Sequence, residues 1–597
     1  MKRQNKLLLS LTMALAIVAN ETLAQSLFGD PYGRYNRGFS AEMAMLRMFI
    51  MAISVGSGFC LGWFMSPQAK HLRRIILLCI AGLTVFLAIF NQGALGWSST
   101  WLVSLVGFFV AVGYWIGTGV KALAEVPTTF GSSRWATIKD MVAKNLFEQG
   151  GIRLGTTTAS KDEAAQEIRY SGDSHLLTVA PTRAGKGVSA IIPNLLSYTG
   201  SVLVIDPKGE NALITAQARK DMGQAVQLVD PWGIAQVDGI PTARFNPLDW
   251  LVAGDVDITE NAMLLADALI MPDGTSDKFW SEEAKALLQG IILYVATDGH
   301  EDGQRHLGRV RDLLLLDGED LTKLFTLMSQ SPHHVVASTG ARSLQKEEKL
   351  LANVIASAQV ETHFLDSARI RESLSVSDFK FEDLKTAAMS IYLVLPADRL
   401  HPFARWLRLL IQQSITVNAR NIADKPEKPV LFILDEMPAL GKLAVIEQAY
   451  GLMAGFGMQL WSFVQDLSQL ERLYGKGWQS FIANTGMINY FGSTDRMTAE
   501  YFSALCGETT VWNFSSALSR AIGTSTGNGG LSSSETVTQS DTRAASQRKL
   551  AYPDELMRMN AKKQLVFIDN MYPMIVTKTP WFEDGDLKAK GVNLHDK

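Results

Sequence analysis

Cysteine and net positive charge are the two features that this sequence of 597 residues has little of. Its three cysteines, Cys60, Cys79 and Cys506, lack the spacing of a zinc site or of a disulfide framework, so we expect neither. The formal net charge is −3, from 56 Lys and Arg against 59 Asp and Glu. A protein that coats nucleic acid with its outer surface is normally basic, so any contact with DNA is expected to be local.

Charged residues are also missing from three apolar stretches near the N-terminus, which lie at about 49–65, 75–90 and 101–119. Each is close to the roughly 17 to 25 residues that cross a hydrocarbon core, so we predict three membrane spans in the region 25–120. The link after the first stretch contains Lys70, Arg73 and Arg74, whereas the link before the third carries no charge. By the positive-inside rule, the first link and everything after Lys121 are cytoplasmic.

The segment 1–24 allows two interpretations. Its apolar run Leu7–Ala19 follows three basic residues and is short for a membrane span. The segment is therefore either a cleavable signal-like segment or a first transmembrane helix. Both alternatives give the same topology for the rest of the chain.

The stretch His175–Leu196 carries the clearest sign of a nucleotide site. An apolar run, Leu176–Val179, leads into a glycine-containing turn and then into a helix-compatible run. That is the strand, loop and helix order of a phosphate-binding loop, in which backbone N–H groups and a helix N-terminus attract phosphate. The residues expected to bind the nucleotide here are Thr182, Arg183, Ala184, Gly185, Lys186, Gly187 and Val188.

This loop departs from the strict G-x-x-x-x-G-K-[ST] pattern at two positions. Ala180 replaces the first glycine, and Gly187 stands where a hydroxyl normally helps to hold magnesium. Lys186 is the residue expected to reach the β and γ phosphates. Because a Gly-Lys-Gly turn also occurs in ordinary surface loops, the assignment depends on the strands that follow.

Polar residues follow three further apolar strands of the predicted sheet. Asp206 follows the first, and we count it among the nucleotide-binding residues; Asp435 and Glu436 end the second, and Gln465 follows the third. Open α/β sheets bind their ligands at the carboxyl ends of the strands. We expect Asp435 to hold Mg²⁺, Glu436 to polarise the attacking water and Gln465 to contact the γ phosphate.

Two other segments have a distinctive composition. The segment 298–382 is rich in helix formers and poor in strand patterns, which predicts an all-helical region. The stretch 515–543 is dominated by Ser, Thr, Gly and Asn without apolar periodicity, so we expect a flexible loop there. A late strand is predicted at 564–568.

Taken together, the segments resemble the type IV coupling proteins, the membrane ATPases of conjugation and type IV secretion, which are related to FtsK-like DNA translocases. The sequence APTRAGKG at 180–187 is a usual form of the family's phosphate loop, with both departures. The family's other motifs are matched, in the same order and over nearly the whole chain, at 131–136, 151–155, 206–210, 279–282, 430–436, 463–466 and 548–555.

The resemblance implies an α/β fold, a RecA/FtsK-like P-loop NTPase motor domain, with N-terminal transmembrane helices. The motor would consist of residues 121–297 and 383–597, with the all-helical domain 298–382 inserted for substrate recognition. The resemblance further implies a multi-pass protein of the bacterial inner membrane, a homo-hexamer with ATP and Mg²⁺ at its subunit interfaces. The implied partners are inner-membrane channel components of the secretion system, single- or double-stranded DNA, and either a relaxase–DNA complex or effector proteins.

Some alternatives stay open at this point. Ring ATPases usually need an arginine from the neighbouring subunit, for which Arg472 and Arg496 are candidates, although either can equally be an ordinary surface residue. If Gly187 has removed the magnesium ligand, the protein is a docking receptor with a weak ATPase. A DNA segregation or packaging translocase would share the fold, but the predicted spans and the missing basic tail count against it.

Overall fold

The computed structural model describes residues 109–110, 112–114, 116–117, 128–158, 164–270, 278–527 and 530–594. The larger of its two compact units contains residues 131–509 and 547–597, and the smaller contains residues 1–130 and 510–546. No helix within the described ranges is both long and apolar enough to cross a membrane. The segment 1–24, the predicted spans at 49–65 and 75–90, and most of the one at 101–119 lie outside the described residues.

The larger unit is built on one 11-stranded sheet. Seven neighbouring strands are parallel, in the order β9, β3, β8, β7, β4, β6, β5. In that order they span Thr485–Tyr490, His175–Val179, Met458–Val464, Val430–Leu434, Val202–Asp206, Met389–Val394 and Ala225–Val229. Except for β5, they are buried at every residue, as expected for strands that are covered on both faces.

Four antiparallel strands extend the sheet beyond β9, in the order β12, β13, β1, β2. They span Lys563–Ile568, Met574–Thr577, Ile152–Thr156 and Glu167–Tyr170. The sheet is therefore mixed. A short turn joins β12 to β13, and a turn of this length can connect only antiparallel strands, because parallel neighbours need a long crossover.

Alternate residues of the central strands enter two separate apolar cores. Leu176 of β3 lies in the core that also contains residues of α7 (Ile192–Ser197) and α8 (Glu210–Asp221). Leu177, the next residue, lies in the core shared with α17 (Ala404–Arg420) and α21 (Arg496–Cys506). The sheet is therefore the middle of three layers, with helices on both faces.

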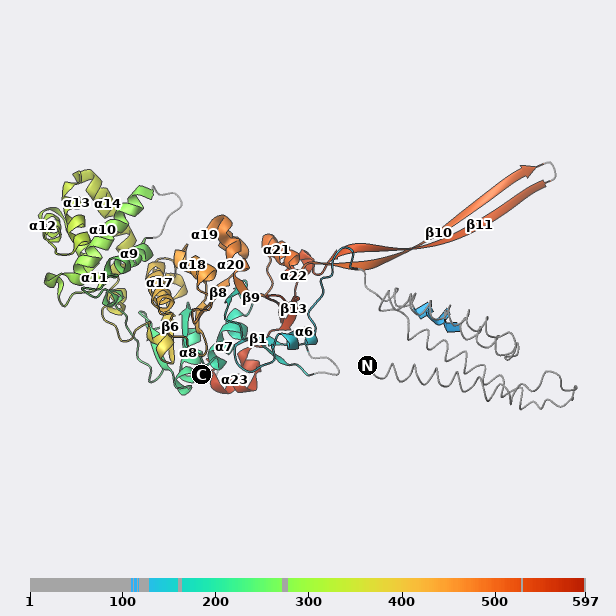
Figure 1. Ribbon diagram of the computed structural model, residues 1–597, viewed down its shortest axis with the longest axis horizontal. Coiled ribbons are helices and arrows are strands. Elements are labelled where there is room, and N and C mark those ends of the chain that lie inside the picture. Colours follow the sequence, from blue (N-terminus) through green and yellow to red (C-terminus); the bar gives the residue numbers. More distant parts are fainter. Residues whose placement is uncertain are drawn as a thin grey trace, which may run out of the picture. The chain divides into compact units, whose positions relative to one another are not determined.

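Between β5 and β6, every named element of the described residues is a helix. The longer ones are α9 (Ile258–Leu269), α10 (Lys278–Thr297), α11 (Leu307–Leu314), α12 (Gly318–Ser329), α13 (His334–Gln345) and α14 (Glu348–Thr362). They lie at the end of this unit opposite β1 and β13 (Figure 1). We predicted the helical domain at 298–382; α10, which lies before residue 298, packs against α11, α13 and α14 of that range.

The smaller unit contains most of a two-stranded sheet, in which β10 (Glu508–Gly527) pairs with β11 (Gly530–Lys549). The stretch 515–543, where we expected a flexible loop, therefore forms strands. Pairing of two strands satisfies the backbone N–H and C=O groups and needs no apolar face, and threonine is favourable in strands. Apolar periodicity was thus the wrong criterion for this segment.

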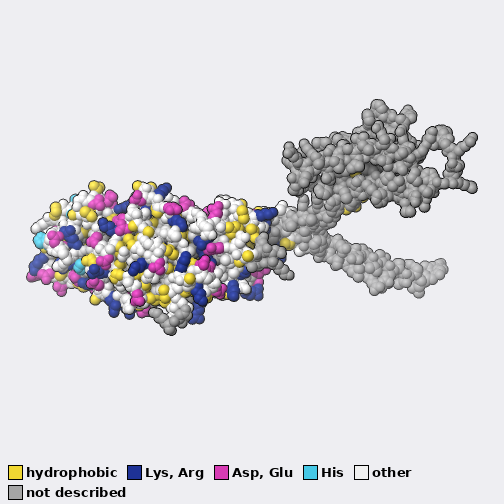
Figure 2. Space-filling model, turned by 90° about the horizontal axis from the view of Figure 1, so that it is seen from below, with side chains coloured by type: hydrophobic (Ala, Val, Ile, Leu, Met, Phe, Trp, Pro, Cys, Tyr) yellow, Lys and Arg dark blue, Asp and Glu magenta, His cyan; other side chains and the backbone are white. Residues whose placement is uncertain are grey.

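Acidic and basic side chains are interspersed over the face of the larger unit that Figure 2 shows. This face carries no continuous basic region of the kind that tracks a nucleic-acid backbone. The picture agrees with the near-neutral composition of the whole chain.

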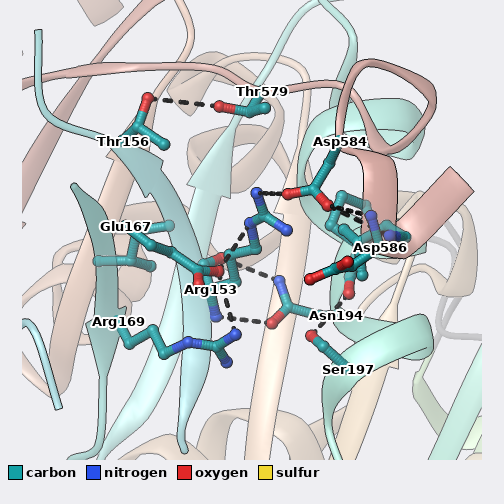
Figure 3. Close-up of polar contacts among 12 residues, drawn as sticks. Arg153, Thr156, Glu167, Arg169, Asn194, Ser197, Thr579, Asp584 and Asp586 are labelled. Atoms are coloured by element: carbon teal, nitrogen blue, oxygen red, sulfur yellow. Dashed lines mark hydrogen bonds and ion pairs between the residues drawn. The ribbon is translucent and has the colours of Figure 1, made fainter. Parts of the chain in front are cut away.

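A buried arginine fastens the C-terminal segment to the sheet edge and to α7 (Figure 3). Arg153 of β1 is 5% exposed, its Nη2 donates to Asp584 Oδ2 at 2.6 Å, and its Nε lies 2.9 Å from Glu167 Oε1. Its backbone N–H donates to Asn194 Oδ1 at 2.7 Å, and the Asn194 amide donates back to the Arg153 carbonyl at 2.9 Å. One side chain therefore joins β1, β2 and the residues after β13.

We expect Arg153→Met to lower the free energy of unfolding by about 2 kcal/mol, because two carboxylates lose a buried partner while keeping some contact with solvent. Arg134→Met is the matched control, since the Arg134–Asp140 pair is exposed and such pairs are worth about 0 to 1 kcal/mol. Urea unfolding of both variants and of the parent measures the difference. Equal losses in the two variants would contradict the assigned role of Arg153.

Candidate functional site

The loop between β3 and the next helix makes a tight turn. The Ala184 N–H donates to the carbonyl of Pro181 at 3.1 Å. Arg183 and Gly185 have positive φ values of 63° and 87°. A π-helical turn, Gly187–Ile191, follows and continues into α7. Backbone of mixed handedness turns successive N–H groups toward one point, which makes a concave site for an anion.

Lys186 links this loop to the two acids that follow β7. Its Nζ lies 2.8 Å from Asp435 Oδ1 and also donates to Glu436 Oε1. Gln465, which follows β8, donates its Nε2 to Glu436 Oε2 at 3.2 Å. The structure therefore brings together the four residues to which we assigned the chemistry, from the ends of the adjacent strands β3, β8 and β7.

Asp206 lies at the same edge of the sheet, at the end of β4. The parallel register pairs Val204 with Ile433, so two residues further on Asp206 is level with Asp435. Asp206 is 1% exposed, and its Oδ2 accepts a hydrogen bond from the Ala212 N–H at 2.9 Å. One oxygen of the Asp206 carboxylate thus holds the start of α8. The same carboxylate adds negative charge beside Asp435.

The electrostatics of the site favour an additional cation. Burial raises the pKa of Asp206 to about 7, and the charge of Asp435 also raises it. Burial raises the pKa of Asp435 above its ordinary value, although Lys186 acts in the opposite direction. Burial lowers the pKa of Lys186, but the two carboxylates outweigh burial and leave that pKa raised. One ammonium is therefore shared among more negative charge than it can neutralise.

Two of the four non-glycine residues with positive φ in the described chain belong to this site. They are Arg183 in the loop and Glu436, whose φ is 56°. A left-handed conformation costs a residue with a side chain about 1 to 2 kcal/mol and persists where the surroundings enforce it. The backbone is thus strained both in the loop that carries Lys186 and at the acidic pair that Lys186 contacts.

The remaining predicted residues of the loop differ in exposure. Thr182 and Arg183 are exposed, whereas Ala184, Gly185 and Gly187 are half-buried. The side chain of Val188 packs against the apolar cluster around Trp581, so its backbone is the part expected to bind a ligand. A Cβ atom at Gly187 would meet no heavy atom within 4 Å, so the position of the missing hydroxyl is open space.

The two candidate arginines lie on exposed helix surfaces. Arg472 is exposed on α19 (Leu467–Tyr474), and Arg496 is exposed on α21, where it pairs with Glu500 at 2.7 Å. Neither arrangement assigns a role to the arginine, so their contribution to a neighbouring subunit stays a prediction.

Sequence reasoning missed one residue that contacts the phosphate loop. Lys578, directly after β13, donates from its Nζ to the carbonyl of Ala184 at 2.9 Å. The available signal was the one used for Asp206 and Gln465, a polar residue after a short apolar strand. It went unused because strand 574–577 had not been predicted.

The model of the family described as "Type IV secretory system Conjugative DNA transfer" matches residues 134–596. The chain belongs to this family. The resemblance inferred from the motifs is therefore confirmed, and the chain is related to the coupling proteins of type IV secretion and conjugation.

Two relatives in this family show how far the similarity extends. The conjugal transfer protein TraG of Escherichia coli is 30% identical over 543 residues, which cover 82% of this chain and 82% of TraG. The protein VirD4 of Rhizobium radiobacter is 28% identical over 480 residues, which cover 77% of this chain and 64% of VirD4.

The fold is also similar to that of the conjugative coupling protein TrwB, solved in complex with the ATP analogue ADPNP. The TM-score is 0.54 at 16% identity, over 76% of this chain and 96% of TrwB. At this identity the comparison concerns the fold alone. It confirms the α/β P-loop NTPase fold, with a large mixed sheet, for the family member described here.

We expect Lys186→Met to lower the free energy of unfolding by about 2 kcal/mol at about pH 8, because the buried Asp435 loses its cationic partner. The loss should shrink toward about pH 5. Without Lys186 the already raised pKa of Asp435 rises further, so the folded state binds more protons than the unfolded state, and stability falls as the pH rises.

Urea unfolding in EDTA across this pH range measures the effect. The double variant Lys186→Met with Asp435→Asn is the control, because it removes the titrating group and should flatten the pH dependence of the loss. A loss that is the same at both pH values would show that Lys186 does not neutralise Asp435.

Proposed function

We propose that this protein is a membrane-anchored coupling ATPase, which uses ATP hydrolysis to drive DNA–protein or protein substrates into a type IV secretion channel. The observation that carries the proposal is the contact of Lys186 with both Asp435 and Glu436, beneath a loop shaped to bind an anion. Membership of the family and the shared fold of TrwB support it.

ATP binding would require Lys186 to exchange partners. The ammonium contacts two carboxylates in this structure, and a triphosphate is the stronger competitor because it carries more negative charge than either acid. TrwB has been solved with ADPNP and with ADP and Mg²⁺, which supports a nucleotide as the ligand of this chain as well. Binding would therefore free Asp435 and Glu436 for their roles in hydrolysis.

The residues at this edge of the sheet fit a magnesium ion. Within the described residues there is no group of three or more His, Cys, Asp or Glu side chains that could hold a metal by themselves. Mg²⁺ usually binds one or two carboxylates and takes its other ligands from phosphates and water. Asp435 would hold it, with Asp206 level with Asp435, and the ion would neutralise charge on the phosphates.

Glu436 would activate the attacking water. Its Oε2 accepts a hydrogen bond from Gln465, which fixes the carboxylate when Lys186 moves to the phosphates. A carboxylate held in this way can accept a proton from water as the bond to the γ phosphate breaks. Gln465 lies close enough to contact the γ phosphate through the same amide.

The assembly follows from the same proposal. We infer a homo-hexamer of the bacterial inner membrane, with ATP at the interfaces and the motor in the cytoplasm. The exposed Arg472 and Arg496 are available to a neighbouring subunit, and the predicted spans before residue 120 supply the anchor. The inferred partners are channel components, DNA, and a relaxase–DNA complex or effector proteins, which the helical domain would recognise.

A docking receptor with weak ATPase activity is the second candidate. The observation that favours it is the open space at Gly187, where other P-loop proteins have a hydroxyl ligand for magnesium. The two candidates differ in the rate at which the parent protein hydrolyses ATP.

We expect Asp435→Asn and Glu436→Gln to fail at different steps. Asp435→Asn should weaken Mg²⁺-dependent ATP binding, because the metal loses a charged ligand, whereas Glu436→Gln should bind ATP and slow hydrolysis about a hundredfold or more. ATP binding and turnover are measured with and without single-stranded DNA, and Lys186→Ala serves as the control that loses binding. Loss of ATP binding in Glu436→Gln would reverse the two assignments.

We expect Gly187→Ser to change ATP turnover by no more than about threefold, because water can fill a coordination position of Mg²⁺. Gly187→Ala is the matched control, since both side chains fit the open space and only serine adds a hydroxyl. Turnover near zero in the parent, with a large gain in Gly187→Ser alone, would support the receptor instead.

A further inference from the structure

The strand β13 ends at the edge of the sheet where the phosphate loop lies. It is antiparallel to β12, which is antiparallel to β9, and β9 is parallel to β3. β13 and β3 therefore point in the same direction, and the residues after them emerge at one edge. Lys578 is the first residue after β13, so the topology itself brings a lysine to the loop that follows β3.

Lys578 contacts the loop through one backbone atom. Its Nζ donates to the carbonyl of Ala184 at 2.9 Å and lies 4.4 Å from the ring centroid of Phe491, which follows β9. Lys578 is only 7% exposed, and in the described part of the chain no carboxylate forms an ion pair with it. Burial lowers its pKa to about 8. Burying an ammonium without a carboxylate costs free energy. We therefore expect a role for this charge in its contact with the Ala184 carbonyl.

The contact determines where the next N–H group points. The peptide between Ala184 and Gly185 is trans, so its C=O and N–H groups point in opposite directions. Arg183 and Gly185 have positive φ values on either side of Ala184, so this peptide unit is not fixed by regular helix or strand geometry. With the carbonyl held by Lys578, the Gly185 N–H is directed to the opposite side, the side on which phosphates bind.

We propose that Lys578 is a positioning residue of the nucleotide site, which holds the Ala184 carbonyl so that the Gly185 N–H points at the nucleotide's phosphates. The inference rests on the proposed function, because it assumes that this loop binds a nucleotide. Lys578 acts through the loop and not on the reacting atoms. It therefore determines the affinity for nucleotide more than the rate of bond cleavage.

Other contacts hold the segment that carries Lys578. The hydroxyl groups of Thr156 and Thr579 lie 3.4 Å apart, and Asp584 accepts from Arg153 (Figure 3). Lys563 of β12 donates to Thr577 Oγ1 at 2.8 Å. Removing the Lys578 ammonium therefore releases the loop while the segment stays in place. Lys563 is a matched control, because it contacts the residue before Lys578 and makes no contact with the loop in the described chain.

The test compares the full-length parent in detergent with Lys578→Met, Lys578→Arg and Lys563→Met. Calorimetry measures the Kd for ADP with Mg²⁺, and steady-state assays measure KM and kcat for ATP. We expect Lys578→Met to raise Kd and KM about tenfold, as for the loss of a hydrogen bond to a charged group. We expect kcat to change by less than about threefold, and Lys578→Arg and Lys563→Met to resemble the parent.

Each outcome decides between the two proposals. If the parent binds ADP and Lys578→Met binds it equally well, Lys578 is not a positioning residue, although the proposed function stands. If the parent binds no nucleotide, both proposals are overturned. If Lys578→Met lowers the unfolding midpoint without nucleotide, its Kd for ADP is measured well below that midpoint, where the variant is folded. A Kd there equal to that of the parent would also overturn the assignment.

Discussion

One ammonium group shared by two carboxylates organises the candidate site. Lys186 bridges Asp435 and Glu436, and without it a nearly buried carboxylate would lie beside further negative charge. This contact ties the phosphate loop to the strand ends across the edge of the sheet. If the loop binds a phosphate as we propose, the same lysine would have to leave the acids to contact it. Binding and activation would then be one exchange of ionic partners.

The direction of the strands decides which residues meet at this edge. The central parallel strands place Lys186, Asp435, Gln465 and Asp206 at or after their carboxyl ends, as in other open α/β sheets. The antiparallel strands beyond β9 then reverse the chain twice, so that β13 again ends at the same edge. Lys578 reaches the loop for this reason, and Arg153 fixes the segment that follows it. The mixed part of the sheet thus completes the site that the parallel part begins.

Sequence patterns predicted the parts of the site that lie on strongly apolar strands. The runs before Lys186, Asp435 and Gln465 are buried on both faces and stand out as continuous apolar segments. β13 has only four residues, one of them exposed, and leaves no such signal, so Lys578 was missed. The pairing of β10 with β11 was missed because it depends on backbone hydrogen bonds, which any side chain permits.

A second buried cation connects the helical domain to the acidic pair. Arg408 of α17 is 2% exposed, and its Nε donates to the carbonyl of Ala268 in α9 at 3.1 Å. Its Nη1 donates to the carbonyls of Leu440 and Lys442 at 2.7 and 2.8 Å, in the loop that follows Glu436. A guanidinium holds its donors in a rigid plane, so it can satisfy carbonyls of separate segments at once. Arg408 therefore joins α9, α17 and the loop that follows Glu436 in one buried contact.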